Sequence, residues 1–146
     1  MKINFKLFFI LVGLTVIFSS CRTSAPRLDY QALARASVLL GIDINLEDDH
    51  KLYLEAADWI GAPYRGGGDS KRGTDCSGMV YQIYRKVYRI QVPRNTEELK
   101  NKSNKVAKRN LKEGDLVFFS SNRSRKRVAH VGIYLKSGKF IHSSTS

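Results

Sequence analysis

The sequence contains little cysteine, since Cys21 and Cys76 are the only two among its 146 residues. Cys76 therefore has one possible disulfide partner, and the alternative is a free thiol. Internal repeats and low-complexity tracts are also missing, which excludes an array of repeated units. The length that remains is enough for one compact domain.

Acidic residues are scarce beside basic ones, 13 against 25, and the formal charge is +12. Such a surface attracts polyanions, and nucleic acid is the first candidate by charge alone. The basic residues are dispersed, however, through residues 100–112 and 123–127, with few aromatic residues between them for base stacking. We therefore expect solvated basic loops near an anionic envelope and no nucleic-acid partner.

Long hydrophobic runs are missing too, apart from residues 7–18. This run is too short for a membrane-spanning helix, which needs about 20 residues. Lys2 and Lys6 precede it and Ser19-Ser20-Cys21 follow it, which is the order of a secretory signal. An uncleaved N-terminal anchor is the alternative interpretation.

The small residues directly before Cys21 resemble the lipobox of bacterial lipoproteins, in which this cysteine receives lipid and becomes the mature N-terminus. Phe18 departs from the usual Leu or Val of that motif. We expect a signal peptide over residues 1–20, a lipidated tether over 21–27 and one domain over 28–146. This predicts a lipid-anchored protein of the cell envelope, on the periplasmic face of the outer membrane or on the cell surface. Cys76 is then the one thiol left, while a Cys21–Cys76 disulfide is the alternative open to an exported chain.

The apolar pattern predicts helices first and strands afterwards. Helical spacing runs from Leu28 to Gly41, again over residues 47–60, and in a third stretch that begins at Cys76. Residues 115–119, 128–135 and 139–142 are short and rich in β-branched and aromatic residues, as strands are. We expect an α+β fold in which N-terminal helices pack on an antiparallel β-sheet.

Ser137-Gly138 lies between the last two predicted strands and fits a tight hairpin turn. That turn would pair Tyr134 with Ile141 and Leu135 with Phe140. His130 and His142 would then meet only diagonally, and only if they share a face of the sheet.

Cys76 is the candidate nucleophile. It lies where a glycine-rich loop becomes a helix, and the positive end of a helix dipole favours a thiolate over a thiol. His130 and His142 fall in the strand-like segments and are candidates for a base and for a group that orients it. A buried apolar cysteine and two structural histidines are the alternative interpretation of the same residues.

Seven segments in order, from about residue 52 to 146, resemble the NlpC/P60 family of cell-wall peptidases. They are Trp59-Ile60-Gly61-Ala62-Pro63-Tyr64, Gly66-Gly67, Thr74-Asp75-Cys76-Ser77-Gly78, Pro93-Arg94, Gly114-Asp115-Leu116-Val117-Phe118-Phe119, His130-Val131-Gly132-Ile133-Tyr134 and Phe140-Ile141-His142-Ser143-Ser144. The resemblance implies a papain-like α+β fold. It also implies an endopeptidase that cuts peptidoglycan stem peptides between D-glutamate and diaminopimelate or lysine, without metal or cofactor.

The resemblance also implies roles for single residues. Cys76 would be the nucleophile, His130 the base and His142 the residue that orients the base. Tyr64 would place its hydroxyl at the oxyanion, although it can equally cap its loop. Asp75 and Ser77 flank the nucleophile and would contact substrate, cap the helix, or do both.

The chain departs from the family at its end. Family domains usually continue for about one more strand after the third catalytic position, whereas this sequence stops four residues after His142. We expect either a sheet that lacks a C-terminal edge strand or a truncated reading frame. A peptidoglycan-binding or scaffolding lipoprotein without activity is therefore the alternative function.

Overall fold

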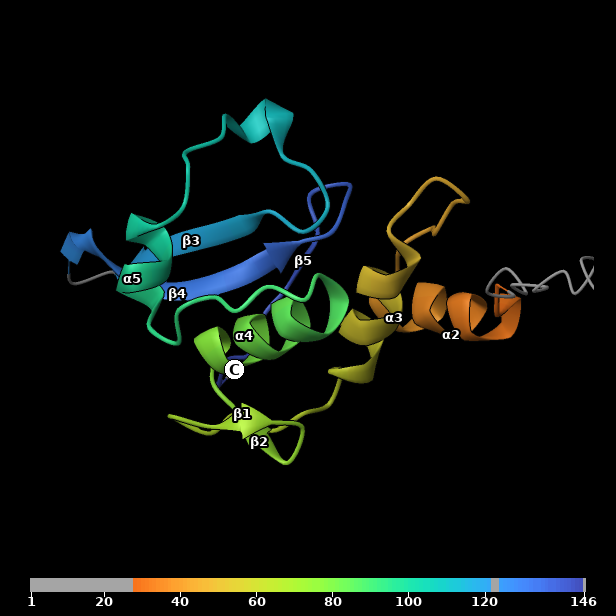
Figure 1. Cartoon of the computed structure of the whole chain (residues 1–146), viewed down its shortest axis with the longest axis horizontal. Coiled ribbons are helices and arrows are strands. Elements are labelled where there is room, and N and C mark those ends of the chain that lie inside the picture. The colour runs from red at the N-terminus through yellow and green to blue at the C-terminus, as the bar shows by residue number, and fades with distance from the viewer. Residues whose placement is uncertain (1–27, 122–123, 146) are drawn as a thin grey trace, which may run out of the picture.

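The computed structural model describes residues 28–121 and 124–145. The predicted signal peptide, Cys21 and the tether lie outside these residues. In the described part, no helix is long and apolar enough to cross a bilayer. Helices are combined with a small antiparallel sheet (Figure 1), so the predicted α+β class is confirmed.

The first two helices, α2 (Tyr30–Leu40) and α3 (His50–Asp58), pack against each other. The carboxylate of Asp29 caps α2 by accepting a hydrogen bond from the Ala32 amide, and Gly41 ends the helix with a left-handed φ of 62°. Helix α3 begins three residues later than the sequence pattern suggested, because Asp49 is its cap. Leu52 and Ala56 of α3 are fully buried.

The third helix, α4 (Cys76–Val87), follows a two-stranded ribbon of β1 (Asp69–Ser70) and β2 (Gly73–Thr74). A short helix, α5 (Thr96–Asn101), and a 3₁₀ turn, Lys108–Asn110, come next. The sequence pattern did not predict α5, since its six residues are mostly polar. Asn95 starts it by accepting hydrogen bonds from the Glu97 and Glu98 amides.

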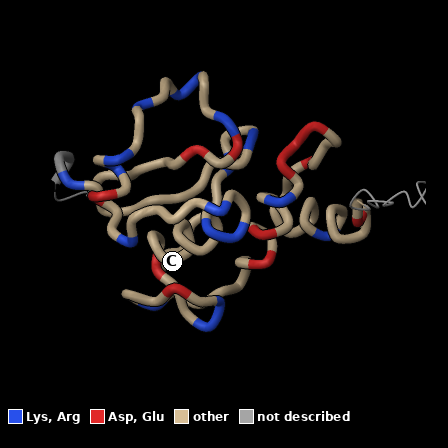
Figure 2. Tube along the Cα trace, viewed as in Figure 1, with Lys and Arg blue, Asp and Glu red and all other residues tan. Residues whose placement is uncertain are grey.

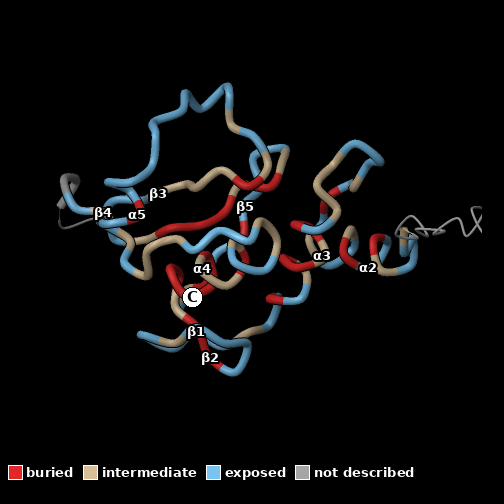
Figure 3. Tube along the Cα trace, viewed as in Figure 1, coloured by how far each residue is buried: buried red, intermediate tan, exposed pale blue. Residues whose placement is uncertain are grey.

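The sheet consists of β3 (Leu116–Ser121), β4 (Ser124–Tyr134) and β5 (Phe140–Ile141) in that order, all antiparallel. Helix α4 packs on β4. Figure 3 shows the buried band that runs along both. The core between them is made of fully buried apolar side chains, among them Met79, Val80, Ile83, Val131 and Ile133.

The expected pairing of β4 with β5 is wrong by one residue. Tyr134 lies opposite Phe140 and Ile133 opposite Ile141. The turn lies at Ser137 and Gly138, as predicted, and both have a positive φ, but it closes with the Leu135 amide donating to the Lys139 carbonyl at 2.9 Å. A shift of one residue moves every side chain of a strand to the other face. This shift decides where His142 lies.

Candidate active site

Cys76 is the first residue of α4, as predicted. Its side chain is 9% exposed, and no disulfide engages it in the described part of the chain. The sulfur lies 3.8 Å from the hydroxyl of Thr96, at the start of α5. The thiol therefore lies at the positive end of a helix dipole, beside a hydroxyl supplied by a second helix.

Asp75 caps α4, which confirms the capping role considered for it. One carboxylate oxygen accepts from the Gly78 amide at 2.7 Å, and the other accepts from the Gly67 amide at 2.8 Å. Arg94 donates to the same carboxylate at 2.9 Å and to the Gly68 carbonyl at 2.8 Å. Asp75 therefore joins three segments directly before Cys76: the glycine-rich loop, the start of α4 and the segment before α5, which supplies Arg94.

Burial raises the pKa of Asp75, but the hydrogen bonds from Arg94, Gly78 and Gly67 outweigh it and the pKa ends below its usual value of 3.8. Ser77 is buried in the same cluster. Its hydroxyl donates to the Arg94 carbonyl at 2.7 Å and accepts from the Arg94 guanidinium at 2.9 Å. In this structure Asp75 and Ser77 hold the start of α4.

His130 and His142 contact each other directly. Nε2 of His130 lies 2.8 Å from Nδ1 of His142, and the rings meet nearly edge to face at 88°. His130 lies on β4, and His142 directly follows β5. One of the two nitrogens must donate to the other, so the contact couples the tautomers of the two rings.

The one-residue shift in register is what brings the histidines together. When the observed pairing is extended by one residue beyond Ile141, His142 lies opposite Gly132. Gly132 is two residues from His130 on β4, so His142 and His130 lie on the same face of the sheet. A Cβ built on Gly132 would lie 2.8 Å from the Ile141 carbonyl oxygen and 3.3 Å from Cβ of His142. Only glycine leaves room for His142 at this distance.

A β-bulge lies directly before His130. Phe119 pairs with His130 and Ser120 pairs with Val128, so Ala129 has no partner on β3. Bulges are common beside active sites, where they redirect a side chain. Phe119 and Phe140 pack beside the two imidazoles, with ring centroids 6.0 Å from His130 and 5.2 Å from His142.

Both imidazoles favour the neutral form. Partial desolvation lowers the pKa of His130 below its usual value of 6.5. Desolvation also lowers the pKa of His142, and the neighbouring His130 lowers it further. At neutral pH the pair therefore contains a nitrogen that can accept a proton.

Tyr64 lies on the loop before the ribbon, and its side chain is 43% exposed. Its backbone forms a bridge with Thr74, two residues before Cys76. The Thr74 carbonyl also accepts from the buried Ser143 hydroxyl at 3.0 Å. This bond ties the residue after His142 to the segment that leads into Cys76.

Three residues of this site received no role from the sequence: Arg94, Thr96 and Ser143. Arg94 and Ser143 stand within the segments that resemble the family, so the motifs marked their positions. Their partners are 19 and 69 residues away in the chain. Separations of that size cannot be read from spacing. Cys21, the predicted lipid site, lies outside the described residues.

The fold and this arrangement define a papain-like domain with a cysteine at a helix start and a histidine pair on the sheet. A model of the NlpC/P60 family matches residues 61–146. A probable endopeptidase NlpC homolog of Haemophilus influenzae is 32% identical over 96% of this chain and 85% of its own length. The chain belongs to the NlpC/P60 family.

Other relatives carry related names. A murein DD-endopeptidase MepS/murein LD-carboxypeptidase of Escherichia coli K12 is 38% identical over 70% of this chain, which spans about half of that protein, 53%. A gamma-DL-glutamyl hydrolase of Bacillus subtilis is 41% identical over 67% of this chain and 24% of its own length. Among solved structures, the NlpC/P60 domain of the peptidoglycan hydrolase SagA aligns with a TM-score of 0.56 and 31% identity, over 68% of this chain and 80% of that one.

Proposed function

We propose that this chain is a peptidoglycan stem-peptide endopeptidase that acts through a Cys76 thioester. The observation that carries the proposal is the 2.8 Å contact between His130 and His142 on a strand packed against α4, the helix that Cys76 begins. Nucleophilic cysteine chemistry requires a thiol and an oriented base on elements that pack together, and α4, which begins at Cys76, packs on β4, which carries His130. The substrate class is supported by the names of the relatives, which include murein endopeptidases.

His130 is the base in this proposal. With its Nε2–H donated to Nδ1 of His142, the Nδ1 of His130 keeps a lone pair for the thiol proton. The Cys76 sulfur then attacks the peptide carbonyl carbon, and the carbonyl oxygen becomes an oxyanion. His142 orients the ring that takes the proton.

The oxyanion needs donors that are already in place. The Cys76 amide is one, because the first amides of a helix have no partner within the helix. The Tyr64 hydroxyl is proposed as the other. His130 returns its proton to the departing amine, and the C–N bond breaks to leave a thioester. Water, deprotonated by His130, then hydrolyses the thioester and restores the thiol.

Helix α5 supports the meeting of thiol and imidazole. Thr96 contacts the Cys76 sulfur, and the neighbouring Glu97 accepts from the Val128 amide at 3.4 Å, two residues before His130. The same short helix therefore contacts the Cys76 sulfur and the strand that carries His130. Catalytic contacts are often longer in a free enzyme and shorten when substrate binds.

Two bonds in the stem peptide are candidates for cleavage. The family resemblance implies the bond between D-glutamate and diaminopimelate or lysine, and the name of the B. subtilis relative, a gamma-DL-glutamyl hydrolase, agrees with that choice. The E. coli relatives are named DD-endopeptidases, which favours a D,D bond instead. Digestion of defined muropeptides, with products identified by mass, distinguishes the two.

We also propose that Cys21 carries lipid and holds the domain at the cell envelope, with residues 21–27 as tether. Residues 7–18 and the small residues before Cys21 support this export signal. Mass spectrometry of the native protein tests it directly. An N-terminus other than acylated Cys21 would disprove the anchor.

The test of the catalytic proposal is Cys76→Ala in the full chain, with release of peptides from purified sacculi as the readout. We expect release to fall to background while the circular dichroism spectrum is unchanged. Cys21→Ser is the matched control, since it removes the other cysteine and should leave cleavage of dissolved muropeptides intact. Unchanged release by Cys76→Ala would overturn the proposal. Sacculi that bind the wild type without being cut would instead indicate a binding lipoprotein.

A further inference from the structure

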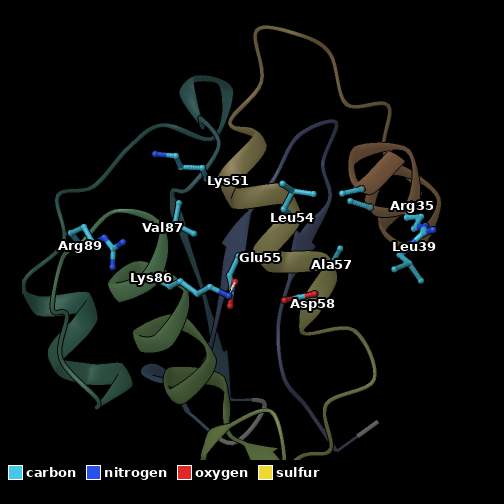
Figure 4. Close-up of a pocket in the computed structure, with 12 residues that line it drawn as sticks. Arg35, Leu39, Lys51, Leu54, Glu55, Ala57, Asp58, Lys86, Val87 and Arg89 are labelled. Carbon is cyan, nitrogen blue, oxygen red and sulfur yellow. Dashed lines mark ion pairs between the residues drawn. The ribbon is translucent and has the colours of Figure 1, made fainter. Parts of the chain in front are cut away.

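A groove of about 630 Å³ lies between α2, α3 and the end of α4. Cys76 lies at the opposite end of α4. Figure 4 shows the side chains that these three helices contribute to it. Its apolar lining includes Ala36, Leu39, Leu54 and Val87. Basic residues, Arg35, Lys51 and Arg89, line it as well. We call it the basic groove.

The basic groove carries an excess of positive charge. Its two carboxylates are both paired: Glu55 with Lys86, and Asp58 with Lys71 at 2.8 Å. Within the described residues, no ion pair engages Arg35, Lys51 or Arg89. Arg35 lies on α2, Lys51 lies on α3 and Arg89 follows the end of α4, so the three unpaired cations come from three segments around one apolar surface.

Helix α2 extends this surface outward. Val38 is 82% exposed and Leu39 is 56% exposed, and α2 contains no acidic residue. The nearby Glu47 lines a different groove, along the flank of α2 formed by Leu33 and Ser37. An exposed apolar ridge beside unpaired cations is the composition of a surface that binds anionic lipid.

We propose that the basic groove and the Val38–Leu39 ridge of α2 dock on an anionic membrane surface. The chain itself supports this occupant, because both interpretations of the N-terminus, lipidated Cys21 or an uncleaved anchor, place a membrane close to residue 21. The nine residue steps from position 21 to Tyr30, where α2 begins, span at most about 32 Å. Helix α2 therefore begins within reach of the bilayer. The proposal rests on the export signal and is independent of the catalytic one.

Docking would orient the site. Lys86 and Val87, at the end of α4, line the basic groove, whereas Cys76 begins the same helix. Twelve helical residues span about 18 Å. Figure 1 shows α2 and α3 at the end of the molecule where α4 finishes. A domain docked through the groove therefore holds Cys76 away from the lipid, facing the cell wall.

The test uses the full chain reconstituted in vesicles, so that every variant keeps the same anchor. Leu39→Trp reports contact with lipid through quenching by brominated phospholipids, and Val106→Trp, 44% exposed in the loop after α5, is the matched control. The native Trp59 is 6% exposed and gives the background. We expect several-fold stronger quenching at position 39 in vesicles of phosphatidylglycerol and phosphatidylcholine than in phosphatidylcholine alone, and little at position 106.

Charge removal separates specific docking from general attraction. Arg35→Gln with Lys51→Gln, in the Leu39→Trp chain, should weaken docking about fivefold for each charge. Lys105→Gln with Lys108→Gln removes the same charge elsewhere and should leave quenching at position 39 unchanged. Three results would each overturn the proposal. They are equal quenching at positions 39 and 106, quenching that does not respond to anionic lipid, and an equal loss of quenching at position 39 in the two double-glutamine variants. Cleavage of dissolved muropeptides should stay at the wild-type rate in all four variants, so a failure here differs from a failure of the catalytic proposal.

Discussion

At the scale of single residues, the His130–His142 contact determines what chemistry the site can support. Two imidazoles at 2.8 Å share one proton along their contact, and both have lowered pKa values. The contact holds the two rings in a fixed mutual orientation, and the lowered pKa values keep both rings neutral at physiological pH. This is the state that a general base needs.

The lowered pKa of His130 predicts the acid side of the pH profile. A histidine with a lowered pKa remains unprotonated at pH values where an ordinary one, with a pKa of about 6.5, is already half charged. We expect the acid limb of kcat/KM for a defined muropeptide to lie below pH 6.5. His50→Ala should leave the limb in place, because His50 lies at the start of α3 and contacts the Asn45 carbonyl. An acid limb at pH 7 or above would contradict the assignment.

At the scale of elements, the register of β4 with β5 determines whether the two histidines meet. The pairing of Ile133 with Ile141 puts His142 on the face of His130, and Gly132 leaves the space for it. A register shifted by one residue would have directed His142 to the opposite face. The strand pairing is thus a catalytic feature in this proposal.

Gly132→Ala tests this element. The added methyl would lie 2.8 Å from the Ile141 carbonyl oxygen, so β5 has to move. We expect a loss of about 1–3 kcal/mol in the free energy of unfolding, measured in urea, and a fall in kcat larger than the change in KM. Gly66→Ala is the control for stability, because a Cβ there meets nothing within 4 Å. A Gly132→Ala protein with wild-type kcat would show that the close approach is dispensable.

The start of α4 is the second element on which the site depends. The Arg94 guanidinium forms an ion pair with the Asp75 carboxylate that caps α4, and it also donates a hydrogen bond to the Gly68 carbonyl. Arg94→Ala should lower the free energy of unfolding by about 1–2 kcal/mol at pH 7, since the pair is partly exposed. Arg109→Ala, at an exposed position in the 3₁₀ turn, is the matched control.

The pH dependence of the Arg94→Ala effect follows from the pKa of Asp75. This pKa is lowered in the folded protein, so the stabilisation is complete above the usual value of 3.8 and is lost as the pH falls through the lower folded value. The difference between Arg94→Ala and wild type should therefore shrink below pH 3.8. A difference that stays constant down to pH 2 would show that Arg94 acts through packing alone.

At the scale of the whole molecule, distant segments close around the site. The Ser143 hydroxyl, next to His142, donates to the Thr74 carbonyl beside the entry to α4, 69 residues earlier in the chain. This bond ties down the segment that follows β5 and contains His142. In this structure β5, the His130 contact and the buried Ser143 all hold the segment.

Ser143→Ala removes the link between these segments. The Thr74 carbonyl would keep the hydrogen bond from the Arg65 amide at 2.8 Å and lose the one from Ser143, at a cost of about 0.5–1.5 kcal/mol in the free energy of unfolding. We also expect kcat to fall, because His142 is no longer tied to the loop before Cys76. Ser103→Ala is the matched control, since its hydroxyl donates to the Leu99 carbonyl at 2.7 Å at the end of α5. Equal kcat in the two variants would limit Ser143 to a structural role.

The distribution of charge is also a property of the whole molecule. Figure 2 shows basic residues spread over several surfaces, including the loop between α5 and β3, while acidic residues gather in the loop between α2 and α3. Because the charge is dispersed, no single face explains the formal value of +12. The apolar surface beside Arg35, Lys51 and Arg89 distinguishes the basic groove from the charged loops.

The sequence by itself determined the class of the fold, the helix that begins at Cys76 and the candidates Cys76, His130 and His142. These depend on local patterns, namely apolar periodicity, caps and turn residues, which neighbouring residues decide among themselves. Tertiary structure alone decided the one-residue register of β5, the balance of Asp75 by Arg94 and the link from Ser143 to Thr74. Each of these joins residues far apart in the chain, and their distances depend on how whole elements pack and not on spacing along the sequence.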